Sequence, residues 1–244
     1  MDRADGMMAD EKKPQESRDV TCDLSPIDMM GKSLDELINE MCPDGVEYKP
    51  LAEVCQYATE RINTQDMGQA GYVGVENLLQ NKKGRGPVSF DTSEQKVIEF
   101  KSGDVLIGNI RPYLKKIWLA DKAGGTNGDV LVIRIREEYE DSVSQRYLFQ
   151  CLSSDSFFHY MMSHAKGAKM PRGDKKATIK FLVPVPPLPV QERIAELLDK
   201  MAELEAELEA EFEARRQQYE WWRDHLLDFR GTRGGGSGRM GLAR

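Results

Sequence analysis

The feature that most constrains this chain of 244 residues is a long amphipathic helix pattern near its C-terminal end. It follows the proline-rich stretch 184–189 and runs from Gln191 to about Phe229, with apolar residues at alternating steps of three and four and a stutter at Leu208. At about 1.5 Å per residue, these ~39 residues span about 58 Å. Because this length exceeds the domain before it, most of the helix is predicted to pack on a partner. The alternative is a helix folded back on its own domain.

The side chains predicted to make this contact form an apolar stripe along the helix. Arg215 fills the one polar position in it. The stripe consists of Ile194, Leu197, Met201, Leu204, Leu208, Phe212, Tyr219, Trp222 and Leu226.

The net charge of −7 is unevenly distributed along the chain. Basic and acidic side chains number 5 and 12 in residues 1–45, 20 and 17 in residues 46–185, 5 and 12 in residues 190–229, and 4 and none from Arg230 onward. The middle segment is therefore positive between two acidic segments. The acidic average does not exclude nucleic acid as a partner of that middle segment.

Composition and periodicity predict an α+β protein. We expect a disordered leader over residues 1–30, a mixed, β-rich domain over 31–185, a coiled-coil helix over 186–230 and a flexible Gly-rich tail over 231–244. Ser33 and Glu36 form a capping-box pattern at the start of a short helix. The strands are predicted to form a barrel-like or folded sheet. Expected strands are 72–75, 97–100, 105–108, 116–120, 130–135 and 178–183, and expected helices are 143–151 and 155–165.

Cysteine and histidine spacing predicts no metal site. The four cysteines form no CxxC pair, and the three histidines lie at no zinc-finger interval. The sequence shows no signal peptide and no apolar run of 18 residues, so we expect a cytoplasmic protein with free thiols.

The strongest local signal for binding is the segment 103–118, in which a buried apolar strand leads into a turn stiffened by Pro112. The polar side chains delivered by this turn are Asn109, Arg111, Tyr113, Lys115 and Lys116. Arg and Asn pair with the edges of guanine and adenine, whereas Lys and Tyr suit phosphates. The segment therefore predicts a DNA-contacting face, with an internal salt bridge for Arg111 and a core position for Tyr113 as alternatives.

Two further basic loops contain glycines, which let a backbone approach phosphates closely. The first contains Lys82, Lys83 and Arg85. The second contains Lys166, Lys169, Arg172, Lys175 and Lys176. Solvated surface or an idle hairpin tip are the alternatives for each loop taken alone. Three such loops converging on one domain would favour phosphate binding.

Catalytic motifs are largely missing from the sequence, which has no Walker loop and no dinucleotide-binding βαβ pattern. Asp91, Glu99 and Lys101 resemble the acid–acid–lysine arrangement of some nucleases, but their spacing is short. We therefore expect a chain that is not an enzyme.

Five segments together resemble the DNA-specificity (S) subunits of type I restriction–modification systems. They are Leu34-Asp-Glu-Leu-Ile-Asn-Glu, Cys42-Pro-Asp-Gly-Val-Glu-Tyr-Lys-Pro-Leu, and the segments 103–116, 184–199 and 215–227. The resemblance extends over most of the chain, from Leu34 to Phe229. It implies a target-recognition domain that reads one half of a bipartite DNA site, and a helix that fixes spacing and docks methyltransferase subunits.

Members of this family typically hold two recognition domains and two spacer helices, whereas one of each is visible here, so the resemblance implies a half-subunit. Two copies would pair their helices antiparallel and read a palindromic, interrupted target. Basic loops would hold phosphates, while Asn109, Arg111, Thr126 and Asn127 would read base edges. S-adenosylmethionine would bind to the partner methyltransferase subunit, and ATP and magnesium to a restriction subunit if one is present. No cofactor is expected in this chain.

Three other functions remain open from the sequence. A dimeric repressor would bind its operator tightly without an enzyme partner. A nuclease using Asp91, Glu99 and Lys101 would cut DNA with magnesium. A truncated decoy would assemble with host subunits and change or block their specificity. Co-purification with methyltransferase subunits distinguishes these functions.

Overall fold

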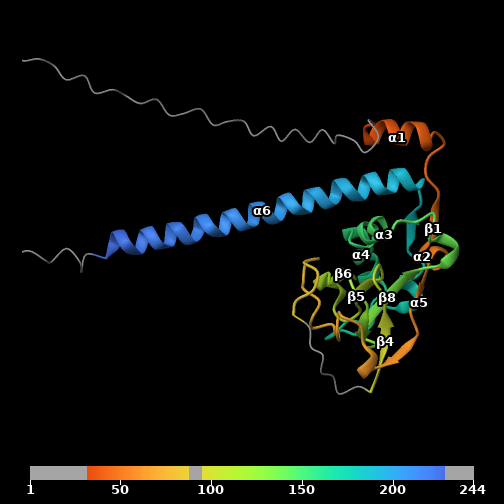
Figure 1. Cartoon of the computed structure of the whole chain (residues 1–244), viewed down its shortest axis with the longest axis horizontal. Helices are drawn as coiled ribbons and strands as arrows, with labels where there is room; N and C mark the ends of the chain where they lie inside the picture. The colour runs from red at the N-terminus through yellow and green to blue at the C-terminus, as the bar shows by residue number, and fades with distance from the viewer. Residues whose placement is uncertain (1–31, 88–94, 229–244) are drawn as a thin grey trace, which may run out of the picture.

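The computed structural model describes residues 32–87 and 95–228, which form an α+β domain followed by one long helix (Figure 1). The predicted leader, the Gly-rich tail and Asp91 lie outside these residues. The strands are β1 (Tyr48–Pro50), β2 (Cys55–Tyr57), β3 (Arg61–Asn63), β4 (Lys96–Phe100), β5 (Val105–Gly108), β6 (Ile117–Leu119), β7 (Gly124–Thr126), β8 (Val130–Ile135) and β9 (Leu182–Pro184). The α-helices are α1 (Leu34–Met41), α2 (Leu51–Val54), α3 (Gln145–Leu152), α4 (Asp155–Ser163), α5 (Lys175–Thr178) and α6 (Leu188–Leu227), and the 3-10 turns are η1 (Thr64–Asp66), η2 (Pro112–Leu114) and η3 (Glu137–Tyr139).

The strands pair antiparallel in three small sheets. The largest has the order β2-β8-β5-β6, a second has the order β3-β4-β7, and β1 pairs with β9. The pairing of β1 with β9 joins the N-terminal part of the domain to the segment that leads into α6. Sequentially distant segments therefore meet directly below the long helix.

The four-stranded sheet is buried on both faces, and the alternation of side chains along β5 and β8 explains why. Val105 and Ile107 of β5 face the core cluster that contains α3 and α4, whereas Leu106 faces a second cluster with Phe100 and Trp118. Successive side chains of a strand point to opposite faces, so the apolar residues of β8 contribute to both clusters: Leu131 and Ile133 to the first, and Val130 and Val132 to the second. The core thus lies on either side of this sheet.

The helix α1 begins where the capping box predicts. The Ser33 hydroxyl accepts a hydrogen bond from the Glu36 backbone, and the Glu36 carboxylate accepts one from the Ser33 backbone. Leu37 of α1 packs against Val190 and Ile194 of α6. The short helix thereby fastens the root of α6 to the domain.

The long helix leaves the domain and continues well beyond it (Figure 1). It begins at Leu188, three residues before the expected start, because Pro187 supplies an N-cap and prolines are compatible with a first helical turn. At its root, the buried Gln191 side chain accepts from the Ser144 backbone at 2.9 Å and donates to the carbonyl oxygens of Ser142 and Pro186 at 2.8 and 2.7 Å. From Lys200 onward nearly every residue is exposed. The alternative of a helix folded back on its domain is therefore wrong for this part of the stripe.

Two expected strands are wrong. Residues 72–75 form only an isolated bridge between Tyr72 and Gly125, because Gly74 enters a turn in which its backbone donates to the Asn77 side chain. The expected strand 178–183 starts only at Leu182. Thr178 instead ends α5, which Asp174 caps by accepting from two backbone N–H groups.

Two features are absent from the part of the chain that the structure describes. No helix in residues 32–87 and 95–228 is long and apolar enough to cross a membrane. Within the same ranges, no group of three or more His, Cys, Asp or Glu side chains is placed to hold a metal ion.

Candidate nucleic-acid interface

The three basic loops predicted from the sequence meet on one surface of the domain. The central loop, residues 109–116, follows β5 and includes η2. Its carbonyl oxygens at Leu114 and Lys115 accept hydrogen bonds of 2.9 Å from the backbone of Asn81 and Lys82 in the loop 79–86. On its other side, the Arg111 backbone donates to the Pro171 carbonyl at 2.7 Å, which joins the loop 166–173. The central loop therefore fixes the positions of both neighbours.

An unusual backbone conformation marks the same surface. Four described non-glycine residues have positive φ, and all four lie in these loops: Asn81, Lys82, Arg111 and Lys115, at 55°, 63°, 52° and 49°. The left-handed region costs a residue with a Cβ about 1–2 kcal/mol. The cross-loop hydrogen bonds hold these residues in that conformation. Such a cluster is typical of sites where function dictates local geometry.

Asp155, at the start of α4, links two of the loops through its carboxylate. Its Oδ1 accepts hydrogen bonds from Lys82 Nζ at 2.8 Å and from Lys115 Nζ at 2.9 Å. The hydrogen bond from Lys82, together with that from Lys115, lowers the pKa of Asp155 to about 2. Sequence reasoning missed this residue because an acidic residue in the first turn of a helix is expected without any further role.

Four other basic side chains of the surface are engaged in ion pairs. Lys83 pairs with Glu209 of α6 at 2.9 Å, Lys166 with Asp174 at 2.6 Å, and Arg172 with Asp129 at 3.0 Å. The Arg85 guanidinium lies 4.8 Å from the centre of the Trp118 ring and 3.8 Å from Asp121. Exposed pairs are worth little to stability, so these cations remain available to a phosphate.

A second group of predicted side chains has no ion-pair partner among the residues that the structure describes. Its members are exposed and lie on the central loop, on the loop 166–173 and on α5. They are Arg111, Lys169, Lys175 and Lys176. Tyr113 is half-exposed on the central loop and not in the core. The salt bridge considered for Arg111 is thus not formed within the described residues.

Three predicted contacts need correction because their side chains point inward. Thr126 is fully buried and its hydroxyl donates to the Val73 carbonyl at 2.5 Å. Asn109 directly follows β5, lies against Gly173 and is 5 % exposed. Lys116 donates to the Val75 carbonyl at 2.6 Å, and its burial lowers the pKa of its ammonium group. These three side chains pack inside the domain beneath the loops and are not presented to a ligand.

Asn127 is half-buried in the turn between β7 and β8. Its Oδ1 accepts from the Asp129 backbone at 3.0 Å, and this local bond closes the turn. The Asn109 backbone connects this turn to the others, since it donates to the Asp129 carbonyl at 2.9 Å and accepts from Gly173 at 3.0 Å. The turn therefore borders the surface, and the Nδ2 group of the Asn127 side chain remains available for a further contact.

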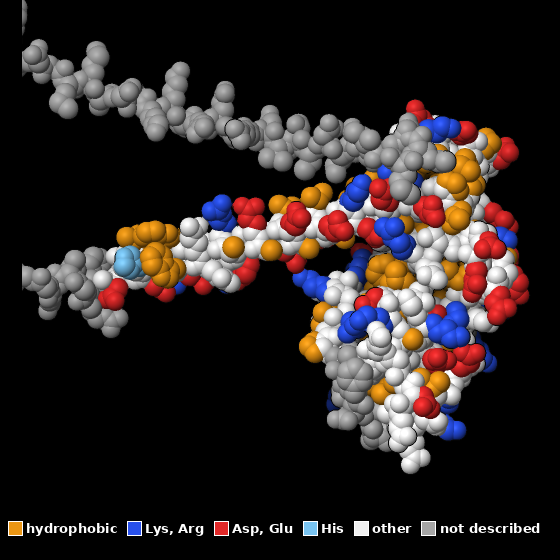
Figure 2. Space-filling model, in the orientation of Figure 1, with side chains coloured by type: hydrophobic (Ala, Val, Ile, Leu, Met, Phe, Trp, Pro, Cys, Tyr) orange, Lys and Arg blue, Asp and Glu red, His pale blue; other side chains and the backbone are white. Residues whose placement is uncertain are grey.

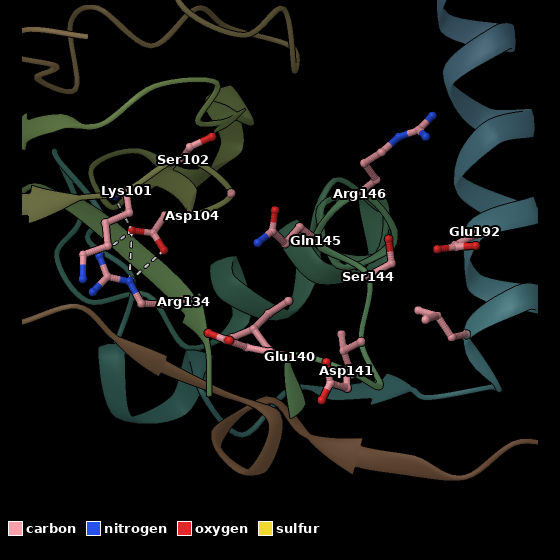
Figure 3. Close-up of a pocket in the computed structure, with 14 residues that line it drawn as sticks. Lys101, Ser102, Asp104, Arg134, Glu140, Asp141, Ser144, Gln145, Arg146 and Glu192 are labelled. Carbon is pink, nitrogen blue, oxygen red and sulfur yellow. Dashed lines mark hydrogen bonds and ion pairs between the residues drawn. The ribbon is translucent and has the colours of Figure 1, made fainter. Parts of the chain in front are cut away.

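A polar cavity of about 570 Å³ lies elsewhere, between the β4–β5 turn, α3 and the root of α6 (Figure 3). Two of the charged groups that line it bind each other. Arg134 donates to Asp104 at 2.7 Å and, outside the cavity lining, to Glu60 at 3.2 Å, and Asp104 also accepts from the Lys101 backbone. Lys101, a member of the nuclease alternative, lies 3.6 Å from Glu60. These pairings join the turn between β4 and β5 to β8.

Comparison with known proteins identifies the family. A family model described as "Type I restriction modification DNA specificity domain" matches residues 43–214, which is more than half of the chain. The chain belongs to this family. The match includes the three basic loops and the first part of α6.

Individual relatives agree with this assignment. A curated relative, the type I restriction enzyme EcoDI specificity subunit of Escherichia coli, is 25% identical over 103 residues, which is 42% of this chain and 22% of the relative. The crystal structure of the HsdS subunit from Thermoanaerobacter tengcongensis has a TM-score of 0.52 and 26% identity, and the match covers 76% of this chain and 47% of that one. This chain thus spans about half the length of its solved relative.

A third similarity concerns the fold alone. A chain from a structure of type I R-M complex assembly and conformational transition has 21% identity and a TM-score of 0.50. The match covers 73% of this chain and 44% of that one. The mixed α+β domain with a long C-terminal helix is therefore the fold of type I specificity subunits.

Proposed function

We propose that this chain is the DNA sequence-specificity subunit of a type I restriction–modification complex and that its domain reads one half of a bipartite site. The observation that carries the proposal is the meeting of three basic loops, joined by backbone hydrogen bonds, within a domain of the DNA-specificity family. A surface rich in Lys and Arg supplies the salt-dependent part of DNA affinity.

This surface would make two kinds of contact with DNA, one to phosphates and one to base edges. Lys82, Lys83, Arg85, Lys115, Lys166, Lys169, Arg172, Lys175 and Lys176 bind phosphates and set the position of the domain on the duplex. Arg111, Tyr113 and Asn127 lie where a groove would pass, and the Arg111 guanidinium is suited to the O6 and N7 atoms of guanine. The strained Arg111 backbone supports this role because it fixes the direction of the side chain.

The exposed stripe of α6 is proposed to bind a second copy of the chain, so that two domains lie at opposite ends of a helical pair. Large side chains such as Leu208, Phe212 and Tyr219 are 66–70 % exposed, which is costly for a helix that stays alone in water. Figure 2 shows the apolar side chains gathered along the helix and at its far end. The same assembly would position methyltransferase subunits, which hold S-adenosylmethionine, and restriction subunits where a system has them.

The test is co-purification of the full chain with the methyltransferase subunits of its own system, followed by mapping of methylated positions in cells with and without the gene. We expect a palindromic, interrupted target that depends on the gene. Methylation at two unrelated half-sites contradicts the symmetric assembly. Tight binding to an operator by the chain alone favours the repressor, and assembly without any methylation favours the decoy.

A further inference from the structure

The spacing of the apolar stripe specifies how two α6 helices would align, if they pair as proposed above. In a twofold antiparallel pair, residue i contacts residue j and residue j contacts residue i, so the stripe must read the same in both directions about the axis. The stutter near Leu208 breaks the regular repeat. Two centres, or positions of the twofold axis, then remain at which the stripe reads the same in both directions. One centre is Leu208 itself, and the other lies between Glu211 and Phe212.

Each centre predicts a different set of contacts. With Leu208 on the axis, Leu204 would face Phe212 and Val190 would face Leu226. With the axis between Glu211 and Phe212, four pairs lie at equal distances from it. They are Leu208 with Arg215, Leu204 with Tyr219, Met201 with Trp222, and Leu197 with Leu226.

Burial opposes the first alignment. Val190 is 1 % exposed because it packs against α1, so its side chain has no surface left for Leu226 of a second copy. Ile194, the first residue of the stripe, would face Trp222 in this alignment, but it also packs on α1. In the second alignment, every apolar stripe residue from Met201 to Leu226 has a side chain that is at least 43 % exposed and so free to make a contact. Leu197 alone among the paired residues is half-buried.

Charge also opposes the first alignment. The segment 203–213 contains six glutamates and no basic residue. With Leu208 on the axis, this segment would lie against its own copy, and the like charges would repel each other. In the second alignment it lies against the segment 210–220, whose three glutamates are accompanied by Arg215 and Arg216, so the repulsion is weaker. A parallel pair would again bring the two acidic segments together.

We infer that α6 is the interface for a second copy of this chain, aligned antiparallel with the twofold axis between Glu211 and Phe212. The two Phe212 rings lie side by side at the axis, where that side chain is 70 % exposed in the single chain. The aliphatic Leu204 and Met201 pack against the aromatic Tyr219 and Trp222 of the other copy. The aliphatic stem of Arg215 covers Leu208 while its charge stays in solvent.

Cysteine cross-linking of the full chain tests this alignment. Helices that pack 8–10 Å apart, with Cα atoms about 2.3 Å from each axis, bring facing Cα atoms to about 3.4–5.4 Å, and the upper part of this range is a distance that a disulfide spans. Under mild oxidation, we expect Phe212→Cys to shift most of the protein to a disulfide-linked dimer. Leu204→Cys and Tyr219→Cys alone should stay monomeric on a non-reducing gel, and their mixture should form the cross-linked pair.

Two controls separate the possible failures. The unchanged chain reports the background from its own cysteines, of which Cys42 and Cys55 are buried. Leu208→Cys should not link to itself. Self-linking at Leu208 without linking at Phe212 overturns the alignment but keeps the proposed dimer, and self-linking at all four positions indicates a parallel pair. A single copy by light scattering, with no cross-link at any position, overturns the dimer as well.

Discussion

Arg111 combines a fixed backbone with an exposed guanidinium, so its substitution should affect reading more than folding. We expect Arg111→Ala to cost about 1–3 kcal/mol of binding to the preferred sequence and to relax discrimination at one base pair. The measurement is a titration of the complex with methyltransferase subunits against duplexes that each carry one changed base pair. An equal loss for all duplexes would assign Arg111 to a phosphate.

Lys175 should behave in the opposite way, because a phosphate contact carries no sequence information. Lys175→Ala is expected to weaken binding to all duplexes alike and to reduce the slope of log affinity against log salt by about 1. Lys32→Ala, beside α1 and away from the three loops, is the matched control and should leave the slope unchanged. A change of preferred sequence in Lys175→Ala would argue against the phosphate role.

The lysine pair around Asp155 should give the fold a specific dependence on acid. The pKa of Asp155 is lowered from 3.8 to about 2, so its contribution to stability is present above about pH 4 and is lost as the pH falls toward 2. We expect Asp155→Asn to lower the unfolding temperature at neutral pH, by an amount that shrinks between pH 4 and pH 2. Because the group is exposed, added salt should also shrink this difference.

The control for this prediction is Asp141→Asn, which makes the same chemical change at an exposed residue between η3 and α3, beside the cavity and away from the lysine pair. Its effect on the unfolding temperature should be small. A difference between the unchanged chain and Asp155→Asn that stays constant down to pH 2 would show that the two lysines do not act through the charge of Asp155.

At the level of elements, the junction between the loops depends on a close approach at Gly173. A Cβ placed there would lie 2.7 Å from Asn109 Oδ1 and 2.8 Å from Met161 Cε. Overpacking of this kind typically costs about 1–3 kcal/mol, so Gly173→Ala should destabilise the chain and separate the loop 166–173 from the central loop. Gly128→Ala is the control, because a Cβ there meets no atom within 4 Å. Urea unfolding and DNA titration of both variants test this expectation.

The sequence predicts those elements whose side chains repeat with a clear period. The strands β5 and β8 and the helix α6 could be predicted in this way, since their apolar residues recur along the chain. The strand β7 was not, because Gly124 and Gly125 read as a loop. In the structure they pack so tightly that a Cβ on Gly125 would lie 2.4 Å from Val97. Its position is set by partners distant in sequence.

The candidate site was predictable to the same degree. Basic residues between glycines are visible in the sequence, and the structure brings their loops together. The inward direction of the Thr126 and Asn109 side chains could not be predicted, since Thr126 ends β7, Asn109 directly follows β5, and the burial of both strands depends on the tertiary fold. Asp155 gave no signal of its own because its partners, Lys82 and Lys115, lie far away in the sequence.

For the whole molecule, the decisive property is the exposed stripe of α6. We expect Phe212→Glu to convert the dimer into a single copy, because the substitution adds two negative charges at an axis already flanked by Glu211 of each copy. Ala214→Glu adds the same charge outside the stripe and should leave the dimer intact. Light scattering measures the mass of each, and thermal unfolding of the domain should be unchanged in both. Equal effects of the two variants would contradict a specific packing of Phe212.

The three loops are tied to one another through main-chain atoms, which every amino acid except proline provides in full. Side chains on their outer surface are thus free to be exchanged without dismantling the platform that carries them. A lineage could replace Arg111 or Tyr113, acquire a new cognate sequence, and still fold and assemble as before. The side-chain atoms of these loops can therefore change with the target, while the main-chain atoms of the same loops maintain the scaffold.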